Sequence, residues 1–148
     1  MADRQRDLAA ALLEAFTAIS AALPVDLPAS DAFPEITESQ LAALHYLARR
    51  GTSEMRTLAA GVGVTSPTMT STIRLLVKKG LVQRDHDLAD WRKVLITASP
   101  RGLAAEAAFM ESRLSALDSA LDRLSAEQRA MLLVAMPALR ALTAGAGA

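Results

Sequence analysis

Residues 53–80 read SEMRTLAAGVGVTSPTMTSTIRLLVKKG, a pattern that predicts two short helices joined by a tight turn. Ala59 is small enough for two crossing helices to touch, and Gly63 can take the positive φ that a sharp helix–helix turn requires. An apolar stripe at helical spacing would pack the second helix onto the rest of the protein. This stripe is formed by Met69, Ile73 and Leu76.

The opposite face of this second helix is polar. It is formed by Ser66, Thr70, Ser71, Arg74 and Lys78. Small hydrogen-bond donors stand near the N-terminal end and cations stand further along, which is what a helix lying in the major groove of DNA presents. A helix pair by itself is a moderate indication, because every helical bundle contains such pairs. The residues that follow it decide the interpretation.

The sequence after Gly80 changes from a helical to an extended period, with a polar turn over residues 85–90. Apolar Val94 and Ile96 alternate with polar neighbours, as in a strand with one solvated face. Residues 81–97 therefore predict a β-hairpin with a charged tip. A helix pair followed directly by such a hairpin predicts a winged helix-turn-helix, which is far more specific than the helix pair alone.

The segments before this unit also predict helices. Residues 3–23 form an amphipathic pattern, and three prolines then predict a loop over residues 24–36. The next helix begins at a capping box made by Thr37 and Gln40 and ends at Gly51.

The C-terminal part predicts a long helix from Ser99 to Leu124, with apolar residues, mostly leucine, at alternating steps of four and three residues. At about 1.5 Å per residue this helix would be roughly 37 Å long. A winged domain cannot cover that length, so part of the helix is expected to meet a second subunit. A final helix from Ser125 to about Leu142 is apolar nearly all round, and we expect it to be buried on several sides and kinked at Pro137.

The composition excludes several classes of function. The chain has 148 residues, no cysteine and two isolated histidines, so it offers no disulfide, no thiolate and no zinc site by spacing. No catalytic triad, paired carboxylates or phosphate-binding glycine loop is visible, and we predict neither an enzyme nor a cofactor. No apolar run approaches the ~18 residues of a membrane span, and the N-terminus is charged, unlike a signal peptide. We therefore expect a cytoplasmic protein without membrane contact.

The net charge is zero, but the charges are unevenly distributed. Residues 37–102 carry ten basic and five acidic side chains, a balance of +5, whereas residues 1–36 carry two basic and six acidic ones, a balance of −4. This concentration of positive charge around the helix pair is the electrostatic pattern of a DNA-binding face, although a solvated charged surface would give it too.

Residues 37–102 resemble the MarR family of winged helix-turn-helix transcriptional regulators. The matching positions are Thr37, Gln40, Leu58, Ala59, Gly63, Val64, Thr68–Thr70, Lys78–Val82, Arg84, Asp87, Asp90, Arg92, Ser99, Pro100 and Gly102. The resemblance implies that the first helix and the last two form a dimer interface, and that the dimer places two recognition helices in successive major grooves. It also implies that Arg92 at the wing tip enters the minor groove, with Asp90 helping to hold it.

These observations predict a mainly α fold with a winged helix-turn-helix at residues 37–102. Dimerisation helices are predicted at residues 1–23 and 103–144, and a disordered tail at residues 145–148. The predicted DNA-binding residues are Arg56, Thr65, Ser66, Pro67, Thr68, Thr70, Ser71, Arg74, Lys78, Arg84, Asp90, Arg92 and Lys93. The predicted dimer-interface residues are Leu8, Leu12, Phe16, Leu114, Leu117, Leu121, Leu132, Met136 and Leu139.

Two positions depart from the family pattern. Ser71 stands where a basic residue is frequent, and Trp91 stands where a charged one is common. For Trp91, packing on the base of the wing is favoured over stacking on a DNA sugar. His45 is expected to be partly buried and hydrogen-bonded, and His86 is expected to be solvated in the wing turn.

The resulting hypothesis is a homodimeric regulator of transcription, a repressor that binds a pseudo-palindromic operator in double-stranded DNA. The resemblance also implies that a small molecule bound between the winged domain and the dimer helices releases the protein from DNA. A small aromatic or carboxylate compound is a possible effector. The alternative is a winged-helix module that binds protein, which would present an apolar or neutral recognition face. The cations that favour DNA are Arg74, Lys78, Lys79, Arg92 and Lys93.

Overall fold

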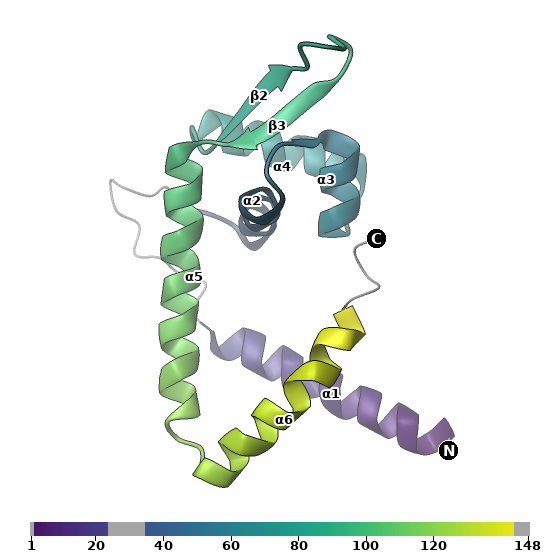
Figure 1. Ribbon diagram of the computed structural model, residues 1–148, viewed down its shortest axis with the longest axis vertical. Helices are drawn as coiled ribbons and strands as arrows, with labels where there is room; N and C mark the ends of the chain where they lie inside the picture. The colour runs from purple at the N-terminus through teal and green to yellow at the C-terminus, as the bar shows by residue number, and fades with distance from the viewer. Residues whose placement is uncertain (1, 24–34, 144–148) are drawn as a thin grey trace.

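The computed structural model of the protein describes residues 2–23 and 35–143 (Figure 1). These residues form α1 (Ala2–Ala22), α2 (Glu38–Arg50), β1 (Ser53–Glu54), α3 (Met55–Val62), α4 (Ser66–Lys78), β2 (Val82–His86), β3 (Val94–Ala98), α5 (Pro100–Leu121) and α6 (Ala126–Thr143). The tail predicted at residues 145–148 and nearly all of the loop predicted at residues 24–36 lie outside the described residues.

The winged unit occupies one end of the molecule, where α2, α3 and α4 gather beneath the β2–β3 hairpin (Figure 1). The sheet is antiparallel, with strand order β1-β3-β2. The predicted mainly α winged helix-turn-helix is thereby confirmed. The sequence did not predict β1 and placed Ser53 at the start of a helix, because a strand of two residues is too short to show an alternating pattern.

The hydrophobic core lies within the winged unit and the first part of α5. Its buried apolar side chains run from Ile36 to Phe109, and the predicted stripe of Met69, Ile73 and Leu76 is at most 1% exposed. No side chain of α1 or α6 in the described residues is buried. The winged unit therefore does not need α1 or α6 to complete its packing.

The helix ends are formed by the predicted residues. Gly63 has φ 78° and joins α3 to α4, which is a conformation that glycine adopts without strain. Thr37 Oγ1 accepts the N–H of Gln40 (3.4 Å), and Gln40 Oε1 accepts the N–H of Thr37 (3.3 Å), so the capping box is complete. The side chain of Ser99 caps α5, and that of Ser125 accepts the N–H of Gln128 at the start of α6.

The C-terminal helices differ from the prediction. α5 ends at Leu121, because the N–H of Leu124 donates to the Leu121 carbonyl (3.0 Å) and closes a turn toward α6. α6 continues past Pro137 to Thr143, and the kink expected at Pro137 stays a prediction. The expectation that α6 is buried on several sides is wrong within one chain: Leu133 and Val134 are 73% and 81% exposed, because α1 and α5 leave most of α6 uncovered.

The start of α5 is fixed directly to the base of the wing. The N–H of Ser99 donates to the Leu81 carbonyl (2.9 Å), and its hydroxyl donates to the Gly80 carbonyl (2.7 Å). The same hydroxyl accepts the N–H of Gly102 (3.0 Å). A Cβ at Gly102 would lie 2.0 Å from the Leu81 carbonyl oxygen, so the close approach of α5 to the chain before β2 requires glycine at this position.

Candidate nucleic-acid interface

The predicted recognition helix, α4, has one buried and one exposed face. Its apolar stripe closes onto the core, whereas the five residues of its predicted polar face are exposed: Ser66, Thr70, Ser71, Arg74 and Lys78. The exposed face carries small hydroxyls in its first turns and cations toward its end. This arrangement leaves a whole helical face open to a ligand beside the wing.

Hydroxyls predicted to contact DNA also hold the first turns of α4. Thr65 Oγ1 accepts the N–H of Thr68 (3.4 Å) and lies 2.8 Å from Thr68 Oγ1. Thr70 Oγ1 donates to the Ser66 carbonyl (2.9 Å). Since Thr70 has committed its only proton, its oxygen can accept a hydrogen bond from a ligand but cannot donate one.

Two aspartates shape the tip of the wing. Asp87 Oδ1 accepts the N–H of Ala89 (2.7 Å), and Asp90 Oδ1 accepts the N–H of Arg92 (3.1 Å). Asp90 therefore holds the main chain of Arg92, and no ion pair joins it to the guanidinium within the described residues. The Arg92 side chain remains exposed.

Two cations near this surface are engaged by the protein itself. Lys93 Nζ lies 3.1 Å from Glu54 Oε1, and the hydrogen bond to Glu54 raises the pKa of Lys93, which stays protonated and ties the wing to β1. Lys79 Nζ donates to the Glu35 carbonyl and to Gln40 Oε1 (2.7 Å for the latter). Lys79 therefore fastens the end of α4 to the start of α2. The sequence did not indicate these partners, because both contacts join residues about 40 positions apart.

Five other cations have no carboxylate within ion-pair distance in the described residues. They are Arg56 on α3, Arg74 and Lys78 on α4, Arg84 on β2, and Arg92 at the wing tip. All five side chains are exposed. Uncompensated cations on neighbouring elements create a positive potential that attracts a polyanion.

Trp91 packs within the wing, but at its tip instead of its base. The indole stacks on the His86 ring, with centroids 4.2 Å apart and planes at 26°, and His86 Nδ1 lies 2.8 Å from the Trp91 carbonyl oxygen. Trp91 is still 73% exposed. His86 is exposed as predicted, yet it is also a structural neighbour of Trp91.

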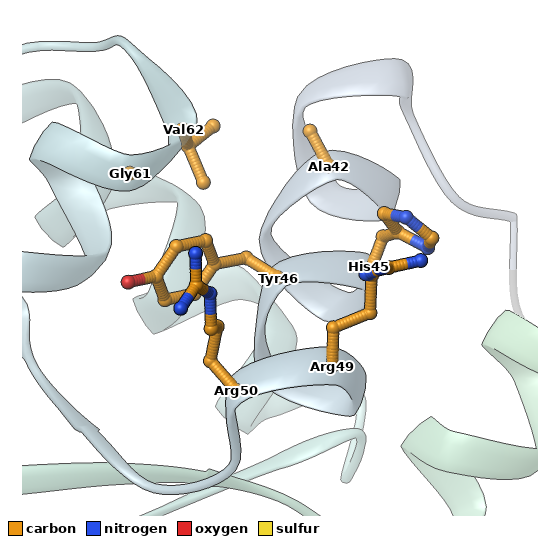
Figure 2. A pocket seen from close by; sticks show the side chains of 7 residues that line it. All are labelled: Ala42, His45, Tyr46, Arg49, Arg50, Gly61 and Val62. Carbon is orange, nitrogen blue, oxygen red and sulfur yellow. The ribbon is translucent and has the colours of Figure 1, made fainter. Parts of the chain in front are cut away.

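A hollow of about 390 Å³ lies between α2 and α3 (Figure 2). It is lined by Ala42, His45, Tyr46, Arg49, Arg50, Gly61 and Val62. The Tyr46 ring lies against Gly61, where a Cβ would come within 2.0 Å of Tyr46 Cε2. His45 is partly buried and hydrogen-bonded as predicted, because its Nδ1 lies 2.7 Å from Glu106 Oε1 on α5. Arg49 and Arg50 have no acidic partner in the described part of the chain, so the hollow is cationic.

The described residues contain neither a metal-binding cluster nor a membrane-spanning helix. No three or more histidine, aspartate or glutamate side chains gather there in an arrangement that could hold a metal ion. Among the same residues, no helix has the length and apolar character needed to cross a membrane.

A helix pair with an open polar face, followed by a hairpin with a cationic tip, defines a winged helix-turn-helix protein. Residues 36–94 match the MarR family model. This winged part of the chain is therefore similar to transcriptional regulators of the MarR family.

Three known proteins are similar to this chain. The transcriptional regulator HosA of Escherichia coli is 28% identical over 100 residues, which are 68% of this chain and 74% of HosA. RV1404 of Mycobacterium tuberculosis has a TM-score of 0.74 at 23% identity, over 95% of this chain and 93% of that one. BpsR of Bordetella bronchiseptica, whose structure concerns regulation of DNA binding by 6-hydroxynicotinic acid, has a TM-score of 0.65 at 21% identity, over 90% of this chain and 98% of BpsR. At these identities, the similarity to RV1404 and BpsR shows a shared fold.

Proposed function

We propose that this protein is a homodimeric repressor that binds double-stranded DNA, with α4 in the major groove and the wing along the minor groove. The observation that carries the proposal is the set of five exposed cations without carboxylate partners in the described residues, which lie on α3, α4 and the wing. A protein-binding module would instead favour an apolar or neutral face here. The charged face therefore supports DNA over the protein-binding alternative.

The predicted DNA-binding residues divide by their place in the fold. Those of α4 and its cap would contact bases and phosphates in the major groove: Thr65, Ser66, Pro67, Thr68, Thr70, Ser71, Arg74 and Lys78. Arg56 on α3 would contact phosphate. On the wing, Arg84 and Arg92 would contact the minor groove. Asp90 and Lys93 would stabilise the wing itself, Asp90 through the main chain of Arg92 and Lys93 through Glu54.

The dimer is supported by apolar surface that one chain leaves open. A hollow of about 600 Å³ lies among α1, α5 and α6, and its apolar lining includes Phe16, Leu117, Leu121, Leu132, Met136 and Leu139. Two further leucines of these helices, Leu8 on α1 and Leu114 on α5, are each 61% exposed. Large exposed apolar patches on monomeric proteins mark interaction sites. We therefore assign residues 1–23 and 103–144 to dimerisation, and residues 37–102 to DNA binding.

Fluorescence anisotropy with a labelled duplex tests the function. The duplex would have about 30 base pairs, enough for two half-sites one or two helical turns apart, and would come from the DNA beside the protein's own gene. We expect binding that weakens steeply with salt, because phosphate contacts release counterions. A flat salt response, or no binding at low salt, would favour the protein-binding alternative.

Release by a small aromatic carboxylate is the second part of the proposal, with the ligand between α2 and α3 instead of between the winged unit and the dimer helices. The cationic hollow of Figure 2 supports it, since Arg49 and Arg50 can pair with a carboxylate and Tyr46 offers an aromatic wall. Added benzoate is expected to lower the DNA affinity of the wild-type protein in the same titration, and to have less effect on Arg50→Gln. An equal benzoate response in both proteins would place the effector elsewhere.

A further inference from the structure

The wing tip carries two large apolar side chains that the proposed DNA contacts do not use. Leu88 is fully exposed and Trp91 is 73% exposed, three residues apart in the turn between β2 and β3. The same hairpin bears Arg84 and Arg92, which have no carboxylate partners in the described residues. Apolar and cationic groups therefore share one projecting tip.

His86 fixes the position of Trp91. A carbonyl oxygen can only accept, so the 2.8 Å contact between His86 Nδ1 and the Trp91 carbonyl means that His86 carries its proton on Nδ1 and donates it. The stacking of the two rings holds the indole against the end of β2. Trp91 is thus held in one orientation while most of its surface stays open, which lowers the entropy that a contact with a ligand would cost.

We propose that Trp91 and Leu88 contact deoxyribose at the edge of the minor groove beside Arg92, and that His86 is the residue that positions Trp91. This inference rests on the proposed DNA-binding function. The occupant is DNA because the tip adjoins the cations proposed to contact it, and because the nearby carboxylates of Asp87 and Asp90 are turned to main-chain N–H groups. Sugar C–H groups give DNA an apolar surface in the minor groove, where other proteins also insert apolar side chains.

The single tryptophan of the chain makes the test direct, because all indole fluorescence comes from Trp91. The duplex described above is added to the full-length protein, and quenching by acrylamide is measured with and without DNA. We expect saturating duplex to protect Trp91 from acrylamide. Protection already present without DNA would mean that a second copy of the protein covers the tip, and would overturn the inference.

Affinities of matched variants separate the apolar contact from the charged one. Trp91→Ala is expected to bind roughly tenfold more weakly with an unchanged salt slope, whereas Trp91→Phe keeps most of the affinity. Arg92→Ala should also weaken binding, but it should lower the salt slope by about one unit, because one cation that displaces counterions from the minor groove is lost. His86→Ala should resemble a milder Trp91→Ala, and His86→Phe should restore affinity by keeping the stack.

The outcomes distinguish this inference from the function on which it rests. If the wild-type protein binds the duplex while Trp91 stays open to acrylamide, or if Trp91→Ala binds as tightly as the wild type, the wing-tip contact is wrong and DNA binding stands. If the wild-type protein binds no duplex at low salt, both proposals fall together.

Discussion

Replacing Leu117 and Leu132 together by glutamate is expected to give a folded monomer that has lost at least ~100-fold in DNA affinity. Both residues line the apolar hollow among α1, α5 and α6, and Leu132 is 44% exposed in the single chain. Two glutamates in a shared interface would face their symmetry mates and bring uncompensated charge into an apolar contact. Two linked recognition helices bind far more tightly than one, because the second binds at a high effective concentration.

The double variant should change dimerisation without unfolding the winged unit. The buried apolar residues run from Ile36 to Phe109 and include neither leucine, so the winged unit should keep its melting transition and circular dichroism. Light scattering gives the mass, and anisotropy gives the affinity. Glutamate at exposed Ala48 on α2, outside the residues assigned to dimerisation, serves as the control. A double variant that keeps twice the monomer mass would refute the proposed interface.

Replacing Gly102 by alanine is expected to destabilise the winged unit by about 3 kcal/mol, the upper part of the range for overpacking a core. The added Cβ would lie 2.0 Å from the Leu81 carbonyl oxygen and 3.2 Å from Leu44 Cδ2. The nearest atom belongs to the main chain, so it cannot move aside as the end of a flexible side chain would. Either α5 or the chain before β2 must shift, which would also disturb the hydrogen bonds of Ser99.

Thermal and urea unfolding of the full chain measure this effect, with Gly63→Ala as the comparison. Gly63 has φ 78°, but no atom lies within 4 Å of a Cβ added there, so alanine meets only backbone strain of about 1 kcal/mol. Gly102→Ala should therefore lose clearly more stability than Gly63→Ala. Equal losses would mean that α5 can move away from the wing at little cost.

The sequence predicted the parts of the fold that rest on local patterns. Capping at Thr37 and Ser99, the left-handed turn at Gly63 and the buried stripe of α4 all follow from residue type and spacing within a few positions. The resemblance to the MarR family, carried by short motifs around the wing, is likewise confirmed. These features need no information from distant parts of the chain.

The features that were missed depend on contacts between distant residues. Strand β1 exists because Ser53 pairs with Ile96, and Lys93 is held by Glu54 across the same sheet. The stack of Trp91 on His86 depends on how the hairpin brings its two ends together. The burial expected for α6 was wrong for one chain because apolar periodicity identifies a face that seeks a partner, without saying whether that partner lies in the same molecule.

Because α5 is attached to the wing at Ser99, we expect the wing and the long helix to move together as one rigid body. Ser99 is the one residue between β3 and α5, and its hydrogen bonds to Gly80, Leu81 and Gly102 restrict hinge motion at this position. The 22 residues of α5 span roughly 33 Å, so a tilt of about 5° would displace one end by roughly 3 Å relative to the other. In a dimer, a slight change in how the two α5 helices meet would then alter the spacing between the wings enough to lose register with a duplex.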